Sequence, residues 1–183
     1  RAFSKNDDRV KHAVYVMQKL KIANVDLVAF PVGYLISENE QRADELLEPL
    51  VYASRRLKMA FIVGVDLFEI NKLMDEDENI WRSVLSVNHM PALTYAYNPS
   101  NDSSYMFTQR TSAPWQAREK LCSNLLAKME RAINIKKRKV ELWSCGEIYD
   151  FRTLKATANR EPDLVCLCGH QNMPRIAMSF RKF

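Results

Sequence analysis

The stretch that decides the fold is residues 140–150, Val-Glu-Leu-Trp-Ser-Cys-Gly-Glu-Ile-Tyr-Asp. Up to Cys145 its side chains alternate between two faces, as on a β-strand, and Gly146 follows where the chain can turn sharply. A thiol at the end of a strand, before a glycine and the carboxylate of Glu147, could be a nucleophile. The more common case is a structural cysteine that closes a core strand, because free cysteine is among the most buried residue types.

Apolar segments of strand length occur on both sides of this stretch. We expect strands over 26–30, 60–65, 83–90, 92–97 and 105–111 before it, and over 163–168 after it. We expect helices over 8–23, 37–58, 114–134 and 151–158. Pro31 should end the first strand, and Pro49 should break the second helix. Helices and strands alternate at first and strands follow one another in the middle, so an α/β fold with a mixed sheet is expected.

Length and composition are those of one globular domain. The chain has 183 residues, a net charge of +5 and no internal repeat or clear linker, so residues 1–183 are expected to form a single domain. It opens with Arg1, and we expect it to belong to a longer chain. No apolar run approaches the roughly 18 residues of a membrane span. The four cysteines do not suggest a disulfide framework, so we expect a reducing, cytoplasmic setting.

Three glycines follow predicted strands. Gly33, Gly146 and Gly169 each lie just beyond the end of an apolar segment. Ligands of open α/β sheets gather outside the carboxyl ends of strands. We therefore expect Val32 and Cys145 to lie close together at one edge, with the end of the strand through Cys168.

Three segments together resemble the nitrilase superfamily, the carbon–nitrogen hydrolases. Residues 26–31, Asp-Leu-Val-Ala-Phe-Pro, resemble the first-strand motif that ends in Phe-Pro-Glu. Residues 60–65 resemble the strand that follows the next helix. Cys145-Gly146-Glu147 resembles the nucleophile motif Cys-x-Glu, and residues 162–165 resemble the strand after it.

The resemblance implies an α-β-β-α sandwich with mixed sheets, incomplete here at its C-terminal side. It also implies a Glu-Lys-Cys triad acting on an amide or nitrile. A thiol attacks such a carbon only when deprotonated, so it needs a base, which is Glu in the family. The negative charge that develops needs a fixed counter-charge, which is Lys.

The sequence departs from this pattern at two of the three positions. Val32 stands where the motif has Glu, and the segment expected to hold the Lys contains Gln109 and Arg110. The candidate catalytic residues are therefore Cys145, Glu147 and Arg110. We expect a degenerate site that is weakly active or inactive, in a domain that serves assembly or partner binding. The alternative is an active C–N hydrolase working through a Cys145 thioester.

Two details of the resemblance stay open. A rival register aligns Tyr149-Asp150 with a Cys-Tyr-Asp variant and puts Ile148 at the nucleophile, and we prefer Cys145. Glu38 or Glu40 could supply the missing base from the segment after the first strand.

A basic run precedes the opening stretch and consists of Lys136, Lys137, Arg138 and Lys139. Such a run is usually a solvated helix end or loop. A nucleic-acid-associated module that uses these four side chains is a further alternative.

Few other partners are indicated by the sequence. Cys166, Cys168 and His170 are ligands that suit zinc, but the C-x-x-C spacing is absent, so no metal or other cofactor is expected. The apolar side of helix 114–134 suggests a homo-oligomer formed through flanking helices. The resemblance also implies that a module such as a reverse transcriptase could be fused to the domain or act as its partner.

Overall fold

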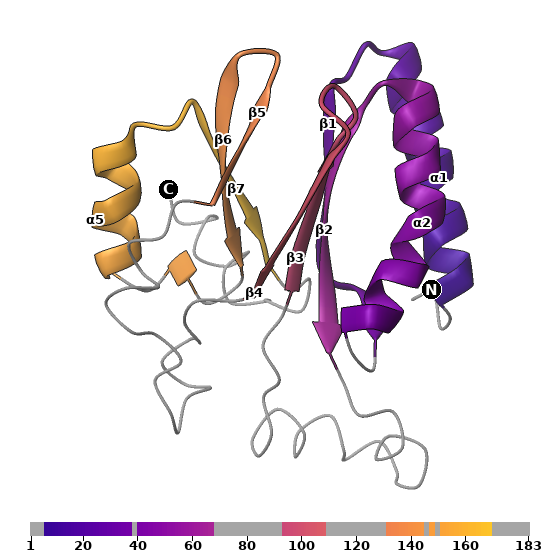
Figure 1. Ribbon diagram of the computed structural model, residues 1–183, viewed down its shortest axis with the longest axis horizontal. Coiled ribbons are helices and arrows are strands. Elements are labelled where there is room, and N and C mark those ends of the chain that lie inside the picture. The colour runs from indigo at the N-terminus through magenta and orange to yellow at the C-terminus, as the bar shows by residue number, and fades with distance from the viewer. Residues whose placement is uncertain are drawn as a thin grey trace, which may run out of the picture.

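The computed structural model describes residues 6–37, 40–67, 93–108, 131–144, 147–148 and 151–169. These residues form two β-sheets that pack face to face between helices (Figure 1). Helices α1 (Asn6–Ile22) and α2 (Glu40–Leu57) cover the outer face of one sheet, and α5 (Phe151–Arg160) covers the outer face of the other. The expected α-β-β-α layering is confirmed.

Both sheets are mixed. The four-stranded sheet has the order β1 (Leu27–Ser37), β2 (Ala60–Leu67), β3 (Leu93–Asn98), β4 (Ser103–Thr108). In it β1 and β2 are parallel, and the other neighbours are antiparallel. The three-stranded sheet has the order β5 (Ala132–Ile135), β6 (Arg138–Ser144), β7 (Leu164–Cys168). There β5 and β6 form an antiparallel hairpin, and β7 is parallel to β6.

The apolar core has two layers. One lies between the four-stranded sheet and its helices and includes Met17, Leu47 and Phe61. The other lies between the two sheets and includes Ile62 and Leu142. Strand β2 is buried on both faces, which explains why residues 60–65 are almost uniformly apolar.

Strand β1 is longer than the sequence suggests. Pro31 was expected to end it, but the strand continues to Ser37. The pairing with β2 shifts register between Phe30 and Leu35, and β1 lies at one edge of its described sheet. A proline that cannot donate a ladder hydrogen bond is tolerated at such an irregular edge position.

Two helix predictions were wrong in one detail each. Helix α2 runs without a break through Pro49, which lies on its exposed side between the buried Leu47 and Leu50. Burial of two leucines on the opposite face offsets the ~3 kcal/mol that an interior proline costs. The helix predicted over 114–134 is wrong at its end, because Ile133 lies in β5 and is buried between the sheets. The rest of that prediction, residues 114–130, lies outside the described residues.

Polar contacts also join the sheets. The hydroxyls of Thr94 on β3 and Ser144 on β6 lie 2.6 Å apart, and both residues are buried. At the other end, Asn98 Nδ2 donates to Asn134 O at 2.7 Å. None of the described helices has the length and apolar character needed to cross a membrane.

Candidate functional site

Strand β1 bulges where the resembled motif would carry its glutamate. Gly33 has φ 72°, in the left-handed region that favours glycine. The side chain before it, Val32, is 2% exposed and belongs to the apolar cluster between the sheets. At the position where a catalytic base was considered, the structure thus has a buried aliphatic side chain.

Contacts from both sides hold this bulge in place. Arg9 Nη1 on α1 donates to the carbonyls of Gly33 and Tyr34, at 3.0 and 2.9 Å. The Tyr34 hydroxyl donates back to Arg9 O at 3.0 Å. On β2, a Cβ added to Gly64 would lie 2.3 Å from Val32 Cα. Only glycine at position 64 therefore lets β2 approach the bulge this closely.

Strand β6 leads toward the candidate nucleophile. Its last residue, Ser144, contacts Thr94 across the sheets and is in register with Cys168 at the end of β7. Cys168 belongs to the same buried cluster as Val32. Strands β1 and β7 also contact each other, so the β1 bulge and the end of β7 share this layer between the sheets. The expected proximity of Cys145 to Val32 stays a prediction. Cys145, the next residue after Ser144, lies outside the described residues.

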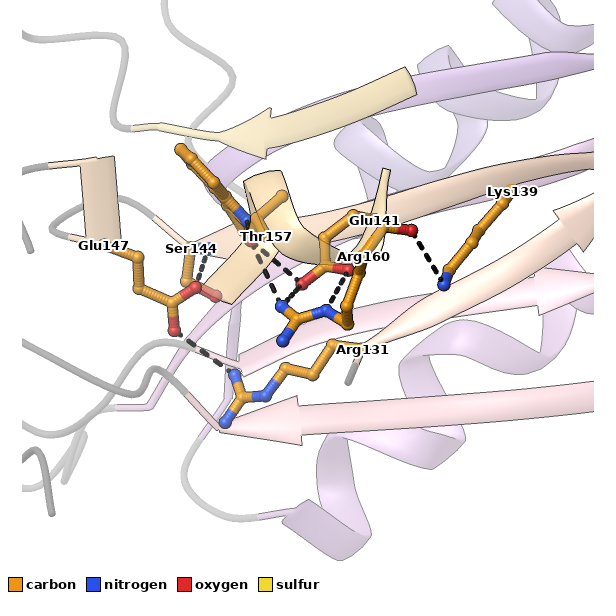
Figure 2. A network of polar contacts seen from close by, with 8 residues as sticks. Arg131, Lys139, Glu141, Ser144, Glu147, Thr157 and Arg160 are labelled. Carbon is orange, nitrogen blue, oxygen red and sulfur yellow. Dashed lines mark hydrogen bonds and ion pairs between the residues drawn. The ribbon is translucent and has the colours of Figure 1, made fainter. Parts of the chain in front are cut away.

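A buried ion pair stands at the turn after β6 (Figure 2). Glu147 is fully buried, and its Oε2 accepts a hydrogen bond from Ser144 N at 3.1 Å. Its Oε1 lies 3.3 Å from Nη1 of Arg131, which is also buried. The Arg131 guanidinium also lies over the Phe107 ring of β4, 5.6 Å from its centroid. The carboxylate nearest in sequence to Cys145 thus binds the strand end and a cation.

Sequence reasoning missed Arg131, because it fell inside the predicted helix 114–134. One signal was available. Residues 133–135, Ile-Asn-Ile, alternate apolar and polar side chains, a period of two that is typical of a strand. The long-range pairing with Glu147 has no such signal.

A second buried carboxylate holds α5 against the sheet. Glu141, fully buried on β6, accepts hydrogen bonds from Thr157 Oγ1 at 3.2 Å and Arg160 Nε at 3.1 Å (Figure 2). Trp143 Nε1 donates to Thr157 Oγ1 at 3.2 Å. Three of these four side chains are buried, and all join one helix to one strand, so the network serves packing.

Several candidate residues lie far from the end of β6 or outside the described residues. Arg110, Gln109 and Glu38 lie outside the described residues. The run from Lys136 to Lys139 is neither a helix end nor near Ser144. It forms the tip of the β5–β6 hairpin and the start of β6, at the opposite end of the sandwich.

The two cysteines of β7 have different environments. Both thiols are free, and Cys168 is buried whereas Cys166 is partly exposed. The hydrogen bond with Cys166, together with burial, raises the pKa of the Cys168 thiol. Within the described ranges, no group of 3 or more His, Cys, Asp or Glu side chains is arranged to hold a metal ion.

Comparisons with known proteins agree with this architecture. No family model matches the chain, and no curated protein matches its sequence. Solved structures do match. An amidase from Nesterenkonia sp. has a TM-score of 0.64 at 10% identity, over 95% of this chain and 63% of the amidase. A related structure of that enzyme is described as belonging to the nitrilase superfamily.

Two other matches have the same character. The carbon–nitrogen hydrolase of Helicobacter pylori G27 has a TM-score of 0.62 at 9% identity, over 100% of this chain and 62% of the hydrolase. The glutamine-dependent NAD+ synthetase of Acinetobacter baumannii has a TM-score of 0.63 at 10% identity, over 98% of this chain and 32% of the synthetase. The chain thus spans less than two thirds of these proteins and shares their fold.

Proposed function

We propose that this chain is a nitrilase-fold domain with a degenerate catalytic site, which serves assembly or partner binding and has little or no C–N hydrolase activity. The observation that carries this proposal is the buried Val32. An isopropyl group stands where the resembled motif has its general base, and it is 2% exposed among apolar neighbours. Loss of a positioned base typically removes about 10² to 10⁴ in rate.

The carboxylate of Glu147 is a poor substitute for that base. Both of its oxygens already face donors, Ser144 N and the Arg131 guanidinium. Proton abstraction from a thiol would weaken the contacts that hold the turn after β6. We therefore assign Glu147 and Arg131 a structural role next to the candidate nucleophile.

Partner binding is supported by the exposed apolar surface of β7. This strand is one edge of its described sheet, and Leu164, Val165 and Leu167 are 50%, 38% and 38% exposed. Exposed apolar edge strands are ready templates for pairing with another strand. The longer structures that share this fold also contain further chain beyond the part matched here.

Turnover of a panel of simple amides and nitriles tests this function. The parent chain should release no more ammonia than the Cys145→Ala variant, because no base activates the thiol. Turnover that the Cys145→Ala change abolishes would instead support the active hydrolase working through a Cys145 thioester.

A further inference from the structure

The turns at one end of the sandwich bring distant basic residues together. The ends of α1, α2 and α5 and the tips of the β3–β4 and β5–β6 hairpins all lie at the upper end in Figure 1, away from Ser144 and Cys168. Ion pairs link them. Lys136 Nζ lies 2.7 Å from Asp26 Oδ1, and Arg55 Nη2 lies 2.9 Å from Asp102 Oδ1.

Cations dominate this end of the molecule. We define the basic end as Lys21, Arg56, Lys58, Lys136, Lys137 and Arg138, of which all but Lys21 are well exposed. Asp26 pairs with Lys136, and Asp163 lies 4.0 Å from Arg138. No carboxylate of the described chain forms an ion pair with Lys21, Lys58 or Lys137. The three helix ends add only about half a negative charge each, so the excess of positive charge remains.

Three lysines of the basic end have left-handed backbone conformations. Lys136 and Lys137 form the two-residue turn of the β5–β6 hairpin with φ 47° and 67°, and Lys58 has φ 50°. Two-residue turns of this kind favour Asn and Gly, because a left-handed conformation costs other residues roughly 1–2 kcal/mol. Asp102 and Glu161, at the same end, have φ 52° and 47°, so the left-handed positions there carry both signs of charge.

Exposed tyrosines accompany these cations on the two outer helices. On α2, Arg56 lies over the Tyr52 ring at 5.7 Å, and Tyr52 is 62% exposed. On α1, Lys19 lies over the Tyr15 ring at 5.3 Å, and Tyr15 is 55% exposed. Both helices end at the basic end (Figure 1), and Tyr52 lies nearer to its helix end than Tyr15 does.

We propose that the basic end binds single-stranded nucleic acid, independently of any chemistry at the β6 turn. Its cations are spread over turns of both sheets on long exposed side chains, which suits a chain of repeating phosphates better than one small anion. The exposed tyrosines offer the stacking surfaces that such proteins use for bases. A membrane surface would use the same charges, so binding to vesicles is compared directly with binding to the oligonucleotide.

Fluorescence anisotropy with a labelled oligothymidylate tests this proposal. The oligonucleotide has about 20 nucleotides, more than the ~4–16 nucleotides that one small domain binds. The variant Lys58→Glu/Lys137→Glu should bind at least about tenfold more weakly at ~50 mM salt, and its salt slope should fall by about 1.4. The matched control Lys11→Glu/Lys155→Glu changes net charge equally at exposed positions elsewhere, and it should lose less than about threefold because salt screens distant charges.

Variants of Tyr52 distinguish binding that includes base stacking from binding by charge alone. Tyr52→Ala should weaken binding about fivefold or more without changing the salt slope, and Tyr52→Phe should restore it because the ring is retained. Absence of binding at low salt would overturn the proposal. Equal losses in the two charge variants, or binding to phosphatidylserine vesicles without binding to the oligonucleotide, would overturn it as well.

Discussion

The pair of Arg131 and Glu147 is the strongest single constraint near the candidate nucleophile. Both residues are buried, and the carboxylate also accepts from Ser144 N, so the pair holds residue 147 against the end of β6 and the start of β5. Removing one partner of a buried ion pair is far more damaging than removing an exposed one.

We therefore predict that Arg131→Met lowers the free energy of unfolding by about 3–5 kcal/mol, as measured by urea denaturation. The double variant Arg131→Met/Glu147→Gln should recover part of this loss, because the amide is neutral. A loss below ~1 kcal/mol in the single variant would mean that the pair does not hold the turn.

At the residue scale the sequence was informative where chemistry is local. Val32, at the position where the resembled motif has glutamate, could be picked out from the sequence because Phe30-Pro31 matches the preceding part of that motif. Arg131 was not recognised, because its partner lies sixteen positions away and pairing over that distance depends on the fold. Gly64 was placed in a strand, but the close approach of Val32 that requires it could not be foreseen.

At the scale of elements, the β5–β6 hairpin combines a strong apolar anchor with a strained turn. Ile133, Ile135 and Val140 are buried between the sheets, whereas Lys136 and Lys137 are in left-handed conformations. Burial of these three apolar side chains therefore stabilises a turn whose conformation is unfavourable for lysine.

Lys137→Gly should therefore raise the free energy of unfolding by up to about 1 kcal/mol. Relief of the left-handed strain, roughly 1–2 kcal/mol, exceeds the entropy that glycine adds to the unfolded chain. Chemical denaturation measures this, with Lys155→Gly in α5 as the control, which should lose about 1 kcal/mol. Destabilisation by Lys137→Gly would contradict the assigned strain.

Element prediction failed where tertiary packing overrides local signals. Pro49 and Pro31 are breakers in sequence, but the first lies on the solvent face of a helix anchored by buried leucines and the second lies at a bulged edge strand. The predicted helix over 151–158 and the predicted strand over 163–168 closely match α5 and β7. No proline interrupts the amphipathic pattern of the one or the apolar run of the other.

At the scale of the whole molecule, the order of short segments was enough to identify the layered fold. The exposed face of β7 could not be foreseen, because it depends on how far α5 extends over the sheet. Val165 and Leu167 are in register with Glu141 and Trp143, which α5 covers, yet both remain over one third exposed.

If β7 is a partner-binding edge, Val165→Lys/Leu167→Lys should abolish concentration-dependent association in sedimentation velocity. Charges on an edge strand discourage pairing, and the exposed positions leave stability within about 1 kcal/mol. Ile22→Lys, at an apolar position with 80% exposure elsewhere, is the control and should associate like the parent. A strictly monomeric parent, or association unchanged in the double variant, would rule this edge out as a self-association surface.

The claim that Cys145 lacks a positioned base is tested most directly by the pH dependence of its alkylation. The tryptic peptide 140–152 contains Cys145 as its only cysteine, so mass spectrometry follows this thiol alone. With Val32 in place of a carboxylate, the rate with iodoacetamide should rise with a midpoint near the ordinary thiol value of about 8.5, as it does in the urea-unfolded chain. A midpoint below about 7 in the folded chain would contradict the proposal, because it would mean that another group activates the thiol.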